Sequence, residues 1–249
     1  MLRETTVFGP IFSRRLGSSL GINLLPERGK VCNFDCVYCE CGWNKDGLED
    51  RKLPGAADVE LALRTKLEEC AAAGTPIDSI TFSGDGEPTL NPSFAQIIDL
   101  TLALRNRYYP AAKVSVLTNA TRAGEESVFQ ALCIVDIAIL KLDAPTDEQV
   151  ALVNRPAGNY HVSEVIRSMK RFNGAFVLQT MFLRGPGWAT EDWVGPGMEV
   201  VRKVTPREVM VYTIDRETPA QGLLKASHEE LDTIRDRVIA AGIPCTASY

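Results

Sequence analysis

The apolar run at residues 135–142 constrains the fold more than any other stretch of this sequence. It is apolar on both faces of an extended chain, which is typical of a parallel strand covered by helices on both sides. Shorter apolar runs recur along the chain and alternate with segments of helical spacing. The sequence therefore predicts six strands, at residues 19–25, 79–83, 113–118, 135–142, 175–183 and 208–213.

Helical segments separate these strands. In residues 59–72, apolar side chains recur at positions i, i+4, i+8 and i+11, the spacing of a helix that buries one face. Strands that alternate with helices favour an α/β fold built on a parallel sheet or barrel. No linker rich in Gly, Ser or Pro interrupts the pattern, so we expect a single domain over residues 1–249 with a short N-terminal arm at 1–18. Helices are predicted at residues 59–72, 91–107, 125–133, 161–171, 191–203 and 228–240, and a last extended piece at 244–248.

The composition is that of an ordinary globular protein. The 249 residues are 45% apolar and 24% charged, which is enough to form a substantial core. A net charge of −5 is not typical of a strongly basic nucleic-acid-binding protein. Charged residues interrupt the apolar runs well short of the roughly 20 residues that a membrane span needs, and residues 1–8 lack the apolar core of a signal peptide. We therefore expect a cytoplasmic protein with no membrane partner.

A cluster of cysteines is the strongest chemical signal. Four of the seven cysteines lie within ten residues, and Cys32, Cys36 and Cys39 have the spacing C-x3-C-x2-C in a loop after the first strand. Thiolates are suitable ligands for iron–sulfur clusters and for zinc. Structural zinc usually takes four ligands, often from two C-x2-C pairs, and no second pair follows here. Three thiolates on a four-iron cluster leave one iron open to react, whereas zinc or unligated thiols are the alternative.

The other four cysteines are not expected to bind the cluster. Cys41 follows Cys39 by two residues; as a fourth ligand it would close the open iron, so we interpret it as a bystander. Cys70 and Cys133 fall on the apolar stripes of predicted helices, and we expect both to be core residues.

Polar residues follow the predicted strands at the sheet edge where catalytic loops project. Glycines after the second strand allow a ligand to approach the backbone closely, although a plain Gly-rich turn is the alternative. Asn119 ends the third strand and Gln179 is a polar residue within the fifth. Lys141 and Asp143 share one face at the end of the fourth strand, where buried charges need either a bound ligand or each other as partners. The segment after the second strand consists of Gly84, Asp85, Gly86 and Glu87.

The cysteine spacing, with the aromatic Tyr38 before the third cysteine, resembles the radical S-adenosylmethionine (SAM) superfamily. The resemblance implies a [4Fe–4S] cluster on Cys32, Cys36 and Cys39, whose open iron binds the amino and carboxylate groups of SAM. Reductive cleavage of SAM then yields a 5′-deoxyadenosyl radical that abstracts hydrogen from a substrate. The resemblance also implies a partial (β/α)6 barrel and an electron donor such as flavodoxin or ferredoxin.

The same resemblance assigns contacts with SAM. The Gly-rich segment is similar to the family's Gly-Gly-Glu motif, which contacts the amino group of SAM, although Asp85 separates the two glycines. Lys141 would meet the cofactor carboxylate and Asp143 a ribose hydroxyl. The full set of expected cofactor contacts is Tyr38, Gly84, Asp85, Gly86, Glu87, Asn119, Lys141, Asp143 and Gln179.

Segments outside the cysteine loop, at 8–17, 141–144, 179–180 and 212–216, resemble wyosine-synthase-like iron–sulfur oxidoreductases. True wyosine synthases add a second cluster and act on tRNA, whereas this chain has no evident cysteines for a second cluster and an acidic balance. We therefore expect a substrate that is still to be identified, with tRNA or a peptide as alternatives. A tRNA substrate would need a basic patch built from Arg14, Arg15, Arg155, Arg184 and Arg216.

Overall fold

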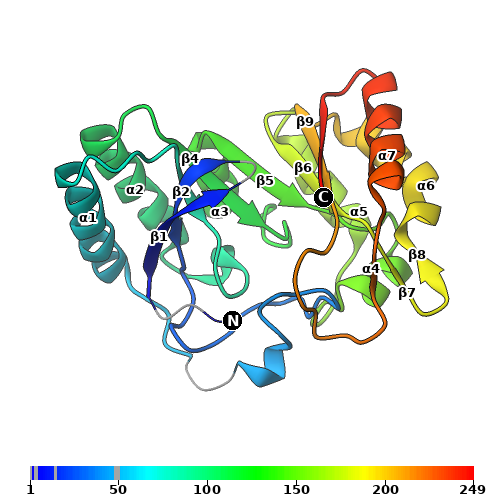
Figure 1. Cartoon of the computed structure of the whole chain (residues 1–249), viewed down its shortest axis with the longest axis horizontal. Coiled ribbons are helices and arrows are strands. Elements are labelled where there is room, and N and C mark those ends of the chain that lie inside the picture. Colours follow the sequence, from blue (N-terminus) through cyan, green and yellow to red (C-terminus); the bar gives the residue numbers. More distant parts are fainter. Residues whose placement is uncertain (1, 3–4, 14–15, 48–50) are drawn as a thin grey trace. The chain divides into compact units, whose positions relative to one another are not determined.

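The computed structural model describes residues 2, 5–13, 16–47 and 51–249 (Figure 1). The chain divides into two compact units. The first comprises residues 1–32, 44–118 and 125–138, and the second comprises 33–43, 119–124 and 139–249. Cys32 therefore belongs to the first unit, and the other three clustered cysteines belong to the second.

The first unit carries four strands in the order β1-β2-β3-β4, with β1 antiparallel to β2 and the others parallel. All four residues of β3 are buried, and helices α1 and α2 pack side by side (Figure 1). The strands are β1 (Val7–Ser13), β2 (Gly17–Ile22), β3 (Ser79–Phe82) and β4 (Lys113–Thr118). The helices are α1 (Ala56–Ala72), α2 (Phe94–Tyr108) and α3 (Glu126–Ile134), with short 3-10 turns η1 (Asn44–Asp46) and η2 (Pro88–Leu90).

The second unit continues the alternation. Strand β5 (Ile137–Lys141) runs into it from the first unit, and β5, β6, β9 and β11 are parallel in that order. The other strands of this sheet are β6 (Val177–Met181), β9 (Glu208–Tyr212) and β11 (Cys245–Ser248). A small antiparallel sheet contains β7 (Leu183–Gly185), β8 (Trp188–Ala189) and β10 (Leu224–Lys225). The helices are α4 (Asp147–Val153), α5 (Val162–Arg171), α6 (Val194–Val204) and α7 (His228–Ala240), with a 3-10 turn η3 (Thr190–Trp193).

The predicted alternation is confirmed: all six strands are present, as β2, β3, β4, β5, β6 and β9, and the last extended piece is β11. The helices predicted between them are α1, α2, α3, α5, α6 and α7. Strand β1, the small sheet and α4 were not predicted. Helix α4 has seven residues, too few for its two buried valines to establish a helical period.

The prediction that Cys133 is a core residue is wrong. Cys133 is exposed, because the apolar stripe of α3 consists of Val128, Ala131 and Leu132, and the cysteine lies beyond it. Cys70 is buried on α1, as expected.

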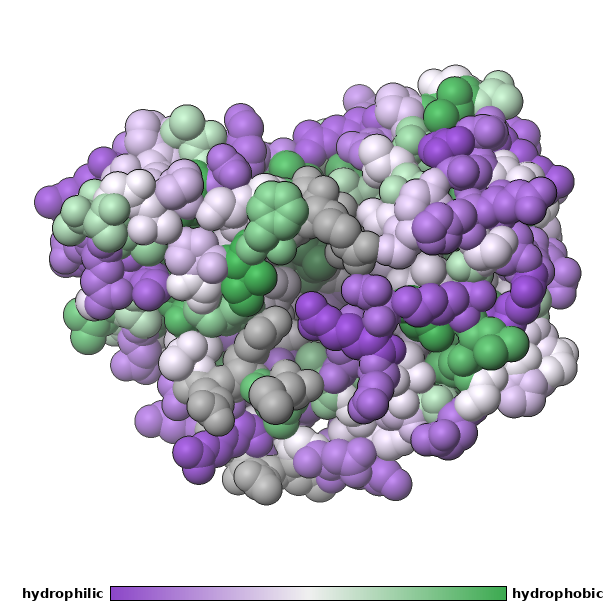
Figure 2. Space-filling model, in the orientation of Figure 1, coloured by the Kyte–Doolittle hydropathy of each residue, from purple (hydrophilic) through white to green (hydrophobic). Residues whose placement is uncertain are grey.

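Within the described part of the chain, no helix has both the length and the apolar character needed to cross a membrane. Hydrophilic side chains cover much of the surface in Figure 2, and the apolar side chains gather in small groups.

Asp136 joins α2 to β4 within the first unit. Its Oδ2 atom accepts hydrogen bonds from Arg105 Nη1 and from the backbone N–H of Val114, each 2.8 Å long. Burial raises the pKa of Asp136, but these hydrogen bonds and the Arg105 charge outweigh it and leave the pKa below its ordinary value.

Replacing Asp136 by asparagine is expected to lower the free energy of unfolding at pH 7 by about 1–2 kcal/mol. A carboxylate with a depressed pKa stabilises the fold above its unfolded pKa of about 3.9, and this contribution is lost as the pH falls through the folded pKa. The difference from wild type is therefore expected to shrink below about pH 4. Urea unfolding across this pH range measures it, with Asp99→Asn on the exposed face of α2 as the control. A difference independent of pH would contradict the prediction.

Candidate functional site

In the first unit, the residues after β3 hold the chain just before Cys32. The backbone N–H of Val31 donates to the Asp85 carbonyl and the N–H of Glu87 donates to the Val31 carbonyl, both at 3.1 Å. Gly86 forms the bridge with Val31 and has a φ of +142°. A Cβ atom on Gly86 would lie 1.9 Å from the Val31 carbonyl oxygen. Only glycine permits this approach, so the Gly-rich segment has a definite structural task beside Cys32.

Two buried acids flank Gly86. Glu87 Oε1 accepts hydrogen bonds from Thr89 N at 3.0 Å, Thr89 Oγ1 at 2.6 Å and Thr118 Oγ1 at 2.7 Å. The backbone N–H of Asp85 donates to Asn23 Oδ1 at 3.2 Å. Exposure is 2% for Glu87 and 1% for Asp85, so both side chains have fixed positions inside the unit rather than in solvent.

Gly84 completes this predicted segment. A Cβ atom at Gly84 would lie 2.1 Å from Asn23 Oδ1. The structure therefore brings Gly84, Asp85, Gly86 and Glu87 together in the first unit, next to the residue that precedes Cys32.

In the second unit, backbone hydrogen bonds connect the cysteine loop to the end of α4. The N–H of Val37 donates to the Val153 carbonyl and the N–H of Asp35 to the Asn154 carbonyl, each at 2.9 Å. The ring of Phe34 packs edge-on against Tyr160 with 5.4 Å between centroids. These contacts order the part of the loop that carries Cys36.

Asn119 supports the start of the same loop. Its Nδ2 donates to Asn33 Oδ1 at 2.7 Å, and its Oδ1 accepts from Thr121 Oγ1 at 2.7 Å. Asn33 Nδ2 in turn donates to Thr121 Oγ1 at 2.8 Å. Asn119 and Thr121, in the turn after β4, thus contact the residue immediately after Cys32.

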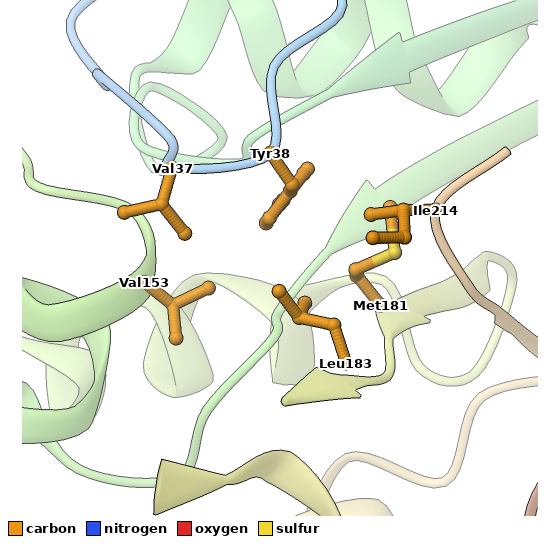
Figure 3. Close-up of a cluster of buried hydrophobic side chains, with 6 residues drawn as sticks. All are labelled: Val37, Tyr38, Val153, Met181, Leu183 and Ile214. Carbon is orange, nitrogen blue, oxygen red and sulfur yellow. The ribbon is translucent and has the colours of Figure 1, made fainter. Parts of the chain in front are cut away.

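Side chains of the loop belong to the apolar core of the second unit. Val37 and Tyr38 point toward residues of α4 and β6, of the small sheet and of the chain after β9 (Figure 3). Trp43 packs against this cluster and lies 4.9 Å beneath the Arg155 guanidinium. The buried members are Val37, Tyr38, Val153, Met181, Leu183 and Ile214.

Asp143 is the centre of a buried polar network. Its Oδ2 accepts from the Tyr38 hydroxyl and from Asn154 Nδ2, the latter at 2.7 Å. Its Oδ1 accepts from the Met181 N–H at 2.9 Å and lies 3.6 Å from Lys141 Nζ. The Lys141–Asp143 pair that the sequence left open is therefore formed.

Lys141 lies between two aromatic rings. Its ammonium group is 4.9 Å from the ring centroids of Tyr38 and Tyr212, and it donates to the Tyr212 hydroxyl. Gln179 pairs in register with Lys141 on the neighbouring strand β6 and is 4% exposed. Burial lowers the pKa of Lys141, but Asp143 and Tyr212 outweigh it and raise the pKa above its ordinary value. Lys141 is thus a fixed positive charge.

Burial also perturbs the acidic groups of the network. It raises the pKa of Tyr38 well above its ordinary value, and the neighbouring Asp143 charge adds to the effect. It raises the pKa of Cys36 to about 11, although the Lys141 charge acts in the opposite direction. At neutral pH the Cys36 thiol therefore keeps its proton.

The cysteines fit the chemistry of an iron–sulfur cluster. All seven are outside disulfides, and Cys32, Cys36, Cys39 and Cys41 are partly exposed. Among the described residues, no three Cys, His, Asp or Glu side chains already converge as metal ligands. The donor set itself is made of soft thiols on a loop, with an amide nitrogen of Asn154 3.3 Å from Cys36 Sγ.

Asn154 is the site residue that the sequence analysis missed. It is 1% exposed at the C-terminal cap of α4, a helix that was not predicted. No local signal in the sequence marks Asn154, because its burial and its contacts depend on how the end of α4 packs against the cysteine loop.

The proposed basic patch lies partly outside the described residues, which exclude Arg14 and Arg15. Each of the other three has a partner within the second unit. Arg155 lies over Trp43, Arg184 pairs with Glu191 at 2.6 Å, and Arg216 pairs with Glu40 at 2.8 Å.

Sequence comparison supports the interpretation of the cysteine loop. The family model of the radical SAM superfamily matches residues 27–194. The UPF0026 protein slr1464 of Synechocystis sp. is 30% identical over 220 residues, covering 86% of this chain and 77% of that protein. A protein named GTPase Obg from Brachyspira hyodysenteriae is 26% identical over 235 residues, which are 93% of this chain and only 33% of the relative.

Solved structures share the fold. A radical SAM methyltransferase from Sphaerobacter thermophilus is 17% identical with a TM-score of 0.70, covering 96% of this chain and 68% of its own. Streptococcus suis SuiB bound to SAM is 15% identical with a TM-score of 0.65, covering 89% of this chain and 49% of its own. The likeness confirms the predicted α/β class with a largely parallel sheet, and the fold of these neighbours is the partial barrel that the resemblance implies. Because the family model matches more than half of the chain, the protein belongs to the radical SAM superfamily.

Proposed function

We propose that Cys32, Cys36 and Cys39 hold the [4Fe–4S] cluster of this radical SAM enzyme and that Cys41 is not a ligand. The observation that carries the proposal is their C-x3-C-x2-C spacing inside the segment matched by the superfamily model. When bound, the cluster supplies the electron that cleaves SAM to methionine and a 5′-deoxyadenosyl radical, which takes a hydrogen atom from the substrate.

The residues of the chain bind and orient SAM in this proposal. Glu87 is a buried carboxylate held by Thr89 and Thr118, and it is suited to accept from the amino group of SAM. Lys141 keeps its positive charge and is suited to the carboxylate of SAM. The contacts of Asp143 favour a role in positioning Tyr38 and Lys141 over the ribose contact expected from the sequence.

The remaining predicted residues keep supporting tasks in the proposal. Asn119 orders the start of the cysteine loop, and Gln179 lies beside Lys141 in the sheet. Gly84 and Gly86 allow the close approach of backbone that the segment around Asp85 needs.

For partners, we propose a reducing protein such as flavodoxin or ferredoxin, in the cytoplasm. We favour a small molecule or a peptide over tRNA as the substrate, because the net charge is −5 and two arginines of the expected basic patch, Arg184 and Arg216, are paired with carboxylates. A peptide substrate has a parallel in Streptococcus suis SuiB, a structural neighbour 15% identical to this chain that was solved bound to its precursor peptide SuiA. In this proposal, the resemblance to wyosine-synthase-like proteins reflects common ancestry and does not identify the substrate.

Anaerobic reconstitution with iron and sulfide, followed by dithionite and SAM, tests the function. The expected result is a cluster with iron and sulfide in equal amounts and formation of 5′-deoxyadenosine, which stops when dithionite is omitted. Metal analysis of the purified protein distinguishes iron from zinc. Zinc in place of iron, or a complete cluster that yields no 5′-deoxyadenosine, would overturn the proposal.

A further inference from the structure

A buried amide lies beside one of the proposed cluster ligands. Asn154 Nδ2 is 3.3 Å from Cys36 Sγ, 3.1 Å from the Tyr38 hydroxyl and 2.7 Å from Asp143 Oδ2. Because the Asp143 carboxylate, paired with Lys141, only accepts hydrogen bonds, the nitrogen of the amide must face this side. One N–H serves Asp143, and the other is directed at the sulfur and the phenol oxygen.

The backbone fixes Asn154 relative to the cysteine loop. Its N–H donates to the Val150 carbonyl at 2.7 Å, which closes the last turn of α4. Its carbonyl accepts from the Asp35 N–H at 2.9 Å, one residue before Cys36. With the side chain 1% exposed, neither rotation nor solvent removes the amide from the sulfur.

We propose that Asn154 is a positioning residue that donates a hydrogen bond to the Cys36 sulfur and thereby raises the reduction potential of the cluster. The inference rests on the proposed function, because it takes Cys36 as a ligand. A hydrogen bond to a ligand sulfur stabilises the reduced cluster, which carries more negative charge, relative to the oxidised one. Because Asn154 is 1% exposed, its replacement by an apolar residue removes this donor from the buried side of the sulfur.

The test compares wild type with Asn154→Leu, which has a similar volume and no donor. Asn154→Ala is made as well, so that a misfit of leucine does not decide the outcome. After anaerobic reconstitution, iron and sulfide are counted and the reduced cluster is titrated by EPR against potential. We expect full clusters and, at any fixed potential, an approximately tenfold lower ratio of reduced to oxidised cluster, which is about 59 mV for a one-electron couple.

Val150→Ala is the matched control. Val150 is 1% exposed on the same helix, so its truncation loosens the packing of α4 but keeps the amide. The cluster of the Val150→Ala protein is expected to have the same reduction potential as the cluster of wild type. The inference is overturned if both Asn154 variants keep the wild-type potential, if the control falls equally, or if both Asn154 variants lose the cluster. In each of these cases a wild-type protein that reconstitutes its cluster still supports the proposed function. A wild-type protein that assembles no cluster overturns both.

Discussion

Replacement of Cys32, Cys36 or Cys39 by alanine is expected to abolish cluster assembly, whereas Cys41→Ala is expected to retain it. A four-iron cluster with an open iron needs three thiolates, and Cys41 is the one further cysteine in the sequence of this loop. The reconstituted variants are compared by iron and sulfide content and by visible absorption. The expected contrast is a loss of at least about tenfold in cluster content for each ligand variant, in line with the effects of removing groups that support a metal site.

Cys41→Ala is the internal control of this series, since it lies in the same loop and is partly exposed like the other three. If any of the three ligand variants kept the iron and sulfide content of wild type, the assignment of that cysteine as a ligand would be refuted. If Cys41→Ala lost the cluster as well, the proposed set of three ligands would be wrong, and a site with four thiolates would take its place.

Gly86→Ala is expected to have the largest effect on folding. Its Cβ atom would lie 1.9 Å from the Val31 carbonyl oxygen, at a φ of +142° that side chains rarely adopt. Backbone cannot move aside as a flexible side chain can, so the bridge that holds the chain before Cys32 must open. We expect a loss of about 3 kcal/mol or more in the free energy of unfolding and a failure to assemble the cluster.

Gly197→Ala provides the comparison for that substitution. It lies within α6, its φ is outside the left-handed range, and a Cβ atom there would meet nothing within 4 Å. Alanine is therefore expected to stabilise the helix by up to about 1 kcal/mol. Urea unfolding of the two apo-proteins measures both effects. A Gly86→Ala protein as stable as wild type would show that the approach of residues 85–87 to Val31 is not required.

The alternation of the chain was predictable because each strand and each long helix repeats its own apolar period over enough residues. Strand β9 and helix α7 were predicted nearly to their ends, and the structure shows that Ser227 caps the start of α7. Edge strand β1 was not predicted, because it pairs with one neighbour and residues 7–12, the part of the strand whose burial the structure describes, form no buried stripe.

The candidate site could be proposed from the sequence where a motif is local, but not where contacts depend on packing. The cysteine spacing and the Gly-rich segment are short-range features. The role of Asp143 as the acceptor of Tyr38 and Asn154 depends on residues 105 and 11 positions away in the chain. No rule of sequence spacing predicts such contacts. Alternation along the strand placed Lys141 and Asp143 on one face, but it did not decide whether the two side chains bind a ligand or pair with each other.

The burial of Val37 and Tyr38 in the apolar cluster has a consequence for how the cofactor is acquired. Small zinc domains fold only when metal arrives, and the binding free energy then has to offset the entropy of ordering the chain. Here Val37 and Tyr38 pack into the core of the second unit through contacts that involve no metal ligand, so we expect the fold of this part of the loop not to depend on the cluster. The apo-protein is accordingly expected to persist as a folded chain during iron shortage or oxidative damage, and to accept a new cluster without refolding.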